Sequence, residues 1–192
     1  MTDEVRRLLS RSTGTDRIIT EKDLAGLPES VQRNLRHAGV IGRQMVNTVR
    51  LKQKGLFRMK QGAKWLPMSA TQYFTTNPPG FIWQVRIKAA PLLWISGRDM
   101  YYEGKGSKKV KLWSFIKVVD VAGPKLDQGA MLRYFGEIIW FPSAYLSDYI
   151  RWESVDSNSA KATMSYNGVT ASATLCCDED GRLIELAADR YM

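Results

Sequence analysis

Histidine and cysteine are almost missing from this chain of 192 residues. His37 is the single histidine, and Cys176 and Cys177 are the two cysteines. So small a supply excludes the common structural zinc sites, a disulfide framework and haem attachment through a Cys-x-x-Cys-His motif. Adjacent residues of a strand point to opposite faces, so the two cysteines are not expected to bridge each other. We therefore expect neither a metal site nor a cofactor.

Long apolar runs are missing as well. No stretch approaches the roughly 20 apolar residues that a membrane-spanning helix needs. Residues 1–10 carry charges where a secretory signal would have its apolar core. Glycine-rich phosphate loops are absent, and a lone histidine offers little for nucleophilic catalysis. We expect a reduced, cytoplasmic protein that does not span a membrane, and we favour a binding protein over an enzyme.

Acidic residues are missing from one long segment. Residues 30–120 contain 17 basic and 3 acidic residues, with no acid between Glu29 and Asp99, whereas residues 121–192 contain 6 basic and 10 acidic ones. Such asymmetry can indicate a weak anionic partner, either nucleic acid or a membrane surface. The simpler interpretation is a solvated basic sheet face that the acidic C-terminal part balances.

The composition is that of a folded domain, with 44% hydrophobic and 24% charged residues. No linker interrupts it, so we predict a single domain over residues 1–192. Apolar residues at every second position alternate with basic ones over 45–60 and again over 81–88, which is typical of strands with one apolar and one basic face. The pattern predicts a helical segment at 1–42, five strands at 43–120, a helix at 126–141 and four strands at 149–191.

Nine antiparallel strands are expected to form one strongly curved sheet of an α+β fold. The helix at 126–141 carries an apolar stripe, namely Met131, Leu132, Phe135, Ile138 and Ile139, and needs an apolar surface to cover it. We therefore predict a half-open barrel that wraps this helix, with the N-terminal helices packed against one end. An apolar groove would then remain between sheet and helix.

Arg133 and Glu137 form an i,i+4 pair on the predicted helix, close to Tyr134 and Trp140. One hypothesis places Glu137 at the mouth of the groove, where burial would raise its pKa and make it a general acid or base, with Arg133 beside it. The alternative is an exposed ion pair worth about 0.3–0.5 kcal/mol.

Aromatic residues could line the groove, although such residues more often belong to the core. The set comprises Trp65, Tyr73, Phe81, Trp83, Trp94, Trp113 and Trp140. Basic residues stand among them, as in single-strand nucleic-acid binders. Trp83 shares its predicted face with Val85 and Ile87 while Arg86 lies opposite, so nucleic acid is not favoured. The residues predicted to bind a ligand are Trp65, Tyr73, Trp83, Tyr134, Phe135, Glu137, Ile139 and Trp140.

Several segments resemble an uncharacterised bacterial family, one of the domains of unknown function. They are residues 27–33, 70–74, 77–83 and 126–142, the last containing Arg133, Glu137 and a Trp-Phe-Pro sequence at 140–142. The resemblance implies that Arg133, Glu137 and Trp140 belong to the family signature, and it implies no activity. The order of strands and helix also resembles the lipoprotein-localisation carriers of the bacterial envelope, which hold acyl chains in an open half-barrel; the export signal of those carriers is missing here.

Three hypotheses follow, and oligomeric state is left open by all of them. The first is binding of an apolar or amphipathic, lipid-like small molecule in the groove. The second is an enzyme that uses Glu137 on such a ligand. The third is anion or nucleic-acid binding by the basic sheet face, which consists of Arg50, Lys52, Lys54, Arg58, Arg86 and Lys88.

Overall fold

The computed structural model describes residues 1–112 and 116–189, so Trp113 and the end of the second predicted meander lie outside the described residues. Three short helices come first: α1 Asp3–Ser10, α2 Glu21–Leu24 and α3 Glu29–His37. Six strands follow: β1 Thr48–Phe57, β2 Leu66–Thr76, β3 Pro79–Ala90, β4 Leu93–Tyr102, β5 Lys105–Leu112 and β6 Ile116–Ala122. The remainder is α4 Pro124–Glu137, two 3-10 turns η1 Ile138–Trp140 and η2 Pro142–Leu146, and strands β7 Ile150–Ser154, β8 Ser159–Tyr166, β9 Val169–Cys177 and β10 Leu183–Ala187.

The described strands form two antiparallel sheets, in the orders β1-β2-β3-β4-β5-β6 and β10-β9-β8-β7. The α+β class is confirmed. The prediction of one sheet with nine strands was wrong, because the described strands form two separate sheets of six and four strands. The predicted fifth strand, residues 108–119, is divided between β5 and β6. Its sequence contains no glycine, proline or asparagine to mark a turn, so the alternation seemed to continue without a break.

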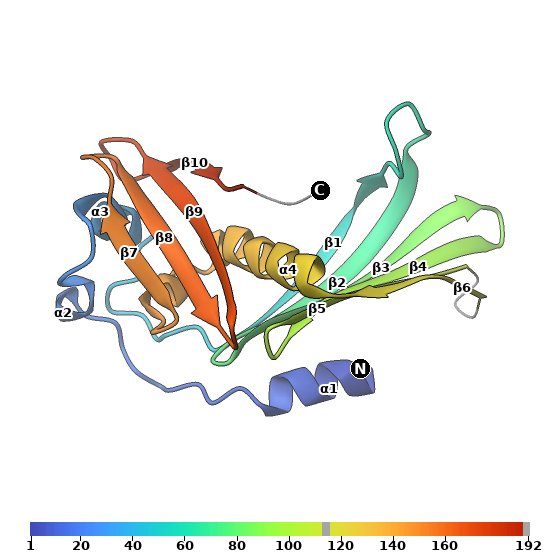
Figure 1. Cartoon of the computed structure of the whole chain (residues 1–192), viewed down its shortest axis with the longest axis horizontal. Helices are drawn as coiled ribbons and strands as arrows, with labels where there is room; N and C mark the ends of the chain where they lie inside the picture. Colours follow the sequence, from blue (N-terminus) through green and yellow to red (C-terminus); the bar gives the residue numbers. More distant parts are fainter. Residues whose placement is uncertain (113–115, 190–192) are drawn as a thin grey trace.

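Helix α4 lies between the two sheets (Figure 1). Ala130, Met131, Leu132, Tyr134 and Phe135 are all at most 8% exposed, and at about 3.6 residues per turn they cover more than half of the helix circumference. A helix of this kind needs two apolar surfaces, and the second sheet supplies one of them. The predicted single stripe missed Tyr134, whose hydroxyl lies 3.1 Å from the Thr75 carbonyl oxygen.

The start of α4 is fixed to the six-stranded sheet by Asp127, which is 3% exposed. Its carboxylate accepts hydrogen bonds from the Gly106 backbone N–H (2.7 Å) and from Lys105 Nζ (3.0 Å). A side chain at Gly106 would place Cβ 2.2 Å from the Leu126 carbonyl oxygen, so only glycine permits this approach of helix and strand. The helix is therefore held close to β5 at its N-terminal end.

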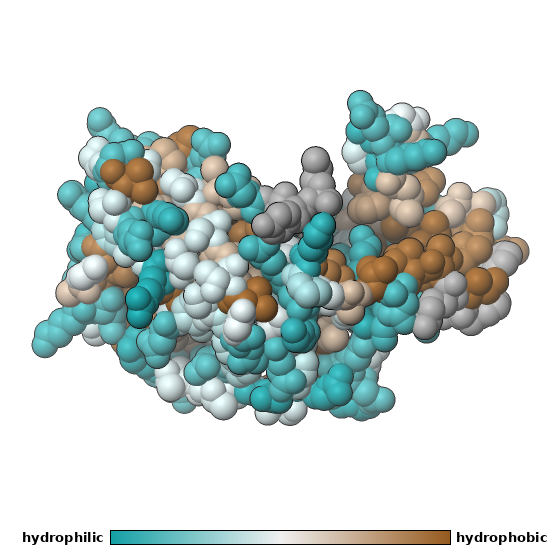
Figure 2. Space-filling view, in the orientation of Figure 1, coloured by the Kyte–Doolittle hydropathy of each residue, from teal (hydrophilic) through white to brown (hydrophobic). Residues whose placement is uncertain are grey.

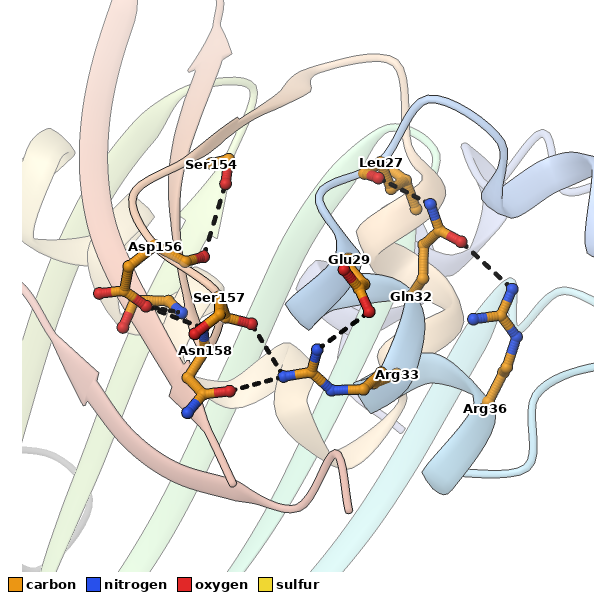
Figure 3. A network of polar contacts seen from close by, with 10 residues as sticks. Leu27, Glu29, Gln32, Arg33, Arg36, Ser154, Asp156, Ser157 and Asn158 are labelled. Atoms are coloured by element: carbon orange, nitrogen blue, oxygen red, sulfur yellow. Dashed lines mark hydrogen bonds and ion pairs between the residues drawn. The ribbon is translucent and has the colours of Figure 1, made fainter. Parts of the chain in front are cut away.

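Helix α3 packs against the four-stranded sheet through polar contacts (Figure 3). Arg33 Nη2 donates to the Ser157 carbonyl oxygen (2.9 Å) and to Asn158 Oδ1 (2.8 Å) in the turn between β7 and β8. Asp156 closes the same turn by accepting from the Asn158 backbone N–H (2.8 Å). These bonds join the N-terminal segment to the C-terminal sheet across more than 120 residues.

Helix α1 packs on the face of the six-stranded sheet that points away from α4. Val5 and Leu8 are buried against Ile82 there, together with Tyr73 and Met100. The N-terminal helices therefore contact both sheets and do not form one cap at an end. In the described part of the chain, no helix is long and apolar enough to cross a membrane.

Candidate functional site

A row of side chains crosses the six-stranded sheet beneath α4. The strand register places Gln72 opposite Trp83, Trp83 opposite Asp99, and Asp99 opposite Lys108. Direct partners in neighbouring strands point to the same face, so these four side chains share the face that α4 covers. Three of them are polar, although the positions before and after them on this face are largely apolar.

Arg133 reaches this row from α4. Its Nη1 lies 2.7 Å from Asp99 Oδ2, and its Nε lies 3.0 Å from Glu137 Oε1. The side chains of Arg133 and Asp99 are each 22% exposed, and that of Glu137 is 17% exposed. The pair predicted from the sequence is therefore neither isolated nor fully exposed, since one guanidinium joins two carboxylates in a partly buried place.

Two aromatic rings of β3 lie against the Arg133 guanidinium. Arg133 Cζ lies 4.9 Å from the centroid of the Phe81 ring and 5.0 Å from that of the Trp83 ring. Both distances are in the range of cation–π attraction. Trp83 is fixed in turn, because its Nε1 donates a hydrogen bond of 2.8 Å to Gln53 Oε1.

Gln72 completes the cluster, which we call the Arg133 cluster (Gln72, Asp99, Arg133 and Glu137). Gln72 is fully buried, and its Nε2 donates to Glu137 Oε2 at 2.6 Å. No donor from residues 1–112 or 116–189 reaches Gln72 Oε1. A buried acceptor of this kind is costly unless it is paired, so it can accept a hydrogen bond from a bound hydroxyl group or water.

A groove of about 520 Å³ runs between α4 and the sheet beside the Arg133 cluster. Its walls include Phe57, Phe81 and Trp83 from the strands and Leu126, Gly129 and Ala130 from the helix. Glycine and alanine fill little space, which leaves room between helix and sheet at this point. Asp99, Lys108, Arg133 and Glu137 supply its polar groups.

The sheet face becomes apolar beyond the cluster. Ala70, Val85 and Ile87 are 3–6% exposed and pack with Phe57, Leu66, Met68, Trp83 and Ile95. Every member of this group, which we call the apolar strip, comes from β1–β4. Its three central residues are buried by the other five, which are only partly buried, and two of these five, Phe57 and Trp83, also line the groove beneath α4. Figure 2 shows hydrophobic residues gathered over the part of the molecule where Figure 1 places the far ends of these strands.

A second hollow, of about 650 Å³, lies on the opposite face beside α1. It is lined by four cations, Arg86, Arg98, Lys109 and Lys111, of which Arg98 has a side chain that is only 10% exposed. Glu4 of α1 lies 3.1 Å from Arg98 and neutralises it. Ala70 and Val85 are the largest apolar side chains that line this hollow, whereas Phe57, Phe81 and Trp83 line the groove beneath α4, which is therefore the better candidate.

The structure brings Trp83, Arg133 and Glu137 together and separates the other predicted residues from them. Tyr134 is buried in the core. Phe135 points toward the four-stranded sheet, with its ring centroid 6.3 Å from that of Trp152. Ile139 packs at the edge of the main core, and Trp140 is 51% exposed with its ring edge toward Phe74.

Tyr73 and Trp65 lie farther away. Tyr73 is on the α1 face of the sheet, where Arg50 stacks on its ring at 5.5 Å. Trp65 lies just before β2 and is 56% exposed. Both were grouped with the groove because they are aromatic, and aromatic character alone does not tell which face of a sheet a residue occupies.

Asp99, Gln72 and Phe57 were missed by the sequence analysis. Asp99 had a usable signal, since it ends the long acid-free segment and falls on a strand. Its pairing with Trp83 depends on the register of β3 and β4, which only the structure reveals. Gln72 and Phe57 carried no signal apart from their place in the alternation.

The two carboxylates of the cluster are engaged by Arg133. Among the described residues, no three His, Cys, Asp or Glu side chains are placed to hold a metal ion, and Arg133 separates the two carboxylates of the cluster. Behind the cluster, burial raises the pKa of Tyr134 and of Tyr149. Their hydroxyl groups are therefore neutral and lie 3.0 Å apart in the core.

Comparison with known proteins gives a family and no activity. No curated protein and no solved structure matches the chain. The model of one family of unknown function, DUF6544, matches residues 17–192, which leaves only α1 and the segment that follows it outside the match. The chain therefore belongs to the family of unknown function DUF6544.

Proposed function

We propose that the chain binds an apolar or amphipathic, lipid-like small molecule in the groove beneath α4. The apolar part of the molecule would lie along the apolar strip, and its polar end would lie at the Arg133 cluster. The curved six-stranded sheet would then act as an open half-barrel. The observation that carries the proposal is that the groove shares Phe57 and Trp83 with the apolar strip, whose outer residues are only partly buried.

Element lengths explain why the outer residues of the strip are only partly buried. The 14 residues of α4 span about 21 Å at ~1.5 Å per residue. The 12 residues of β3 span about 40 Å at ~3.3 Å per residue. A single helix of this length cannot cover such a strand from end to end, and a bound apolar chain would bury what remains.

The polar end of the ligand is constrained by charge. Asp99 and Glu137 are balanced by Arg133 and by Lys108, so the four ionisable groups at the groove sum to no net charge. A strongly anionic group would compete with the two carboxylates for Arg133. We therefore propose a polar end that is uncharged or zwitterionic and that forms hydrogen bonds with the charged groups lining the groove, Asp99, Lys108, Arg133 and Glu137.

The test uses neighbouring residues on opposite faces of one strand. Phe57 belongs to the apolar strip, whereas Leu56 is 61% exposed and pairs with Pro67 on the other face. We expect Phe57→Lys to weaken binding of a fluorescent long-chain acyl probe at least about ten-fold, because it places a charge on an apolar wall. The matched variant Leu56→Lys should bind the probe as the wild type does.

Native mass spectrometry of the chain purified from cells provides an independent measurement. A retained molecule of lipid-like mass is expected, and Phe57→Lys should reduce its occupancy. The proposal is wrong if the wild-type chain retains no such molecule and also fails to bind acyl probes of several lengths.

A second candidate is an enzyme that acts on the same ligand. The observation in its favour is that Glu137 lines the groove and is held from both sides, by Arg133 and by Gln72. Glu137→Gln preserves the shape of the side chain. If the retained molecule accumulates unchanged in this variant but is converted by the wild type, the groove is catalytic; equal conversion by both would exclude Glu137 as acid or base.

A further inference from the structure

The β1–β2 and β3–β4 turns lie at the same end of the six-stranded sheet as the last residue of β5 and the first residue of β6, and this end is the one farthest from the four-stranded sheet (Figure 1). We call the described residues at this end of the strands the hairpin end. Large apolar side chains are exposed on it: Met59 53%, Trp65 56%, Leu92 89%, Ile116 44% and Val118 62%. A protein surface rarely gathers so many exposed apolar residues at one end unless something binds there.

Leu92 is the most exposed of these residues. It occupies the turn between β3 and β4 with φ of 63°, a conformation that favours glycine or asparagine. Its side chain is 89% exposed, so the fold does not bury it and it can contact a partner.

Cations surround these apolar tips. Arg58, Lys60 and Lys64 lie in the β1–β2 connection, Lys88 lies near the end of β3, and Lys111 lies near the end of β5. The sequence segments 55–67, 86–95 and 108–119 contain no acidic residue. Arg58 Cζ stacks 4.8 Å above the Trp65 ring, which joins a cation and an aromatic ring at one tip. In Figure 2, hydrophilic residues lie at the tip of the β1–β2 hairpin, and hydrophobic residues lie over the part of the sheet formed by β3, β4, β5 and β6.

We propose that the hairpin end docks on the surface of a bilayer that contains anionic lipids. Lysine and arginine are attracted to the negative surface potential, while tryptophan and aliphatic side chains insert at the boundary between headgroups and acyl chains. Nucleic acid would use the cations together with stacked aromatic rings, but Leu92, Met59 and Val118 offer no stacking surface. Charge complementarity and apolar tips together therefore favour a membrane surface.

The inference goes beyond the proposed ligand site and does not depend on it. The apolar strip ends at the hairpin end, so docking would bring the open side of the groove close to the lipids. The docking residues and the groove residues are nevertheless different, and each set can be changed without the other.

Vesicle co-sedimentation with the full chain tests the proposal, with phosphatidylcholine vesicles that contain or lack phosphatidylglycerol. We expect binding only to the anionic vesicles, and weaker binding as salt is added. Leu92→Asn should reduce the affinity at least about five-fold, because an inserted leucine side chain is lost. Lys60→Glu with Lys64→Glu should reduce it at least about ten-fold, because two attractive charges become repulsive.

Matched controls lie on the four-stranded sheet. Ile184, 62% exposed on β10, gives Ile184→Asn, and the exposed Arg151 and Arg182 give the same double change of charge. Both controls should bind vesicles as the wild type does. If Leu92→Asn and the lysine variant also bind unchanged, or if the wild type does not bind anionic vesicles at low salt, the proposal is overturned.

The two proposals fail separately. Phe57→Lys should lose the acyl probe and keep its vesicle binding, whereas Leu92→Asn should keep the acyl probe and lose vesicle binding. Leu92→Asn could also bind both duplex DNA and anionic vesicles as tightly as the wild type does. The hairpin end would then act by charge attraction alone, and the membrane proposal would be overturned.

Discussion

The two sheets of the molecule differ in how completely the protein covers their apolar faces. In the four-stranded sheet, the inward residues Ala160, Ala162, Met164 and Leu175 are at most 1% exposed, and the residues between them are polar. In the six-stranded sheet, the apolar face continues past α4 as the apolar strip. The eight residues of β8 span about 26 Å, close to the ~21 Å of α4, whereas β3 is far longer than the helix. Helices α4 and α3 together therefore cover the smaller sheet, whereas α4 covers only part of the length of the larger one.

The same substitution in the two regions should have very different effects on stability. Phe135 is 2% exposed between α4 and Trp152, so Phe135→Ala should lower the free energy of unfolding by about 3–5 kcal/mol. Phe57 is half-buried at the end of β1 and lines the groove, so Phe57→Ala should cost less than about 1.5 kcal/mol. Urea unfolding of both variants measures the difference.

Equal losses in the two variants would contradict the comparison. They would mean that Phe57 belongs to a solid core, and that the apolar strip has no room for a ligand. Unfolding in the presence of a bound acyl probe sharpens the test, because a ligand that binds only the folded state should raise the midpoint of the wild type more than that of Phe57→Ala.

Alkaline pH should weaken the core that lies between the two sheets. Burial raises the pKa of Tyr101, Tyr134 and Tyr145, all between the sheets, and raises that of the Cys177 thiol to about 11. These groups stay protonated in the folded chain, while in the unfolded chain tyrosine ionises near pH 10. Stability is therefore fully present at neutral pH and is lost as the pH rises through about 9–10 and beyond, by up to ~1.4 kcal/mol per pH unit for each group.

Tyr101→Phe isolates one of these groups. Among the described residues no partner reaches the Tyr101 hydroxyl, so its removal should cost little at pH 7. The slope of unfolding free energy against pH above about pH 10 should become shallower by close to one proton. Identical slopes for the wild type and the variant would show that Tyr101 ionises in the folded chain.

Local rules of sequence explain the parts of the fold that were predicted. Period-two alternation identified most strands, and the helix at 126–141 was found within a few residues, because both patterns depend on neighbours along the chain. The division into two sheets depends on which surfaces the helix touches. Tyr134 is polar at its tip and apolar along its ring, so the sequence did not show that it faces the core.

The candidate site was predicted only where it lies within one helix. Arg133 and Glu137 are one turn apart, so their pairing follows from helical geometry. Asp99 and Gln72 come from two strands that are not adjacent in the sheet, and their meeting depends on the registers of three strands and on the position of α4. No property of a single segment contains that information.

The turns of the two sheets permit a smaller and more local test. In the four-stranded sheet, Asn167 and Gly168 form the β8–β9 turn with φ of 48° and 78°, and asparagine and glycine both adopt this conformation readily. In the six-stranded sheet, Leu92 adopts a similar φ of 63° at much greater cost. Leu92→Asn should therefore stabilise the chain by roughly 0.5 kcal/mol, whereas Asn167→Leu should destabilise it by about 1 kcal/mol, in part through the lost hydrogen bond to the Glu103 carbonyl oxygen. Thermal unfolding of the two variants measures both changes. A loss of stability in Leu92→Asn would mean that this leucine contributes to folding, and the argument that it is kept for an external surface would lose its basis.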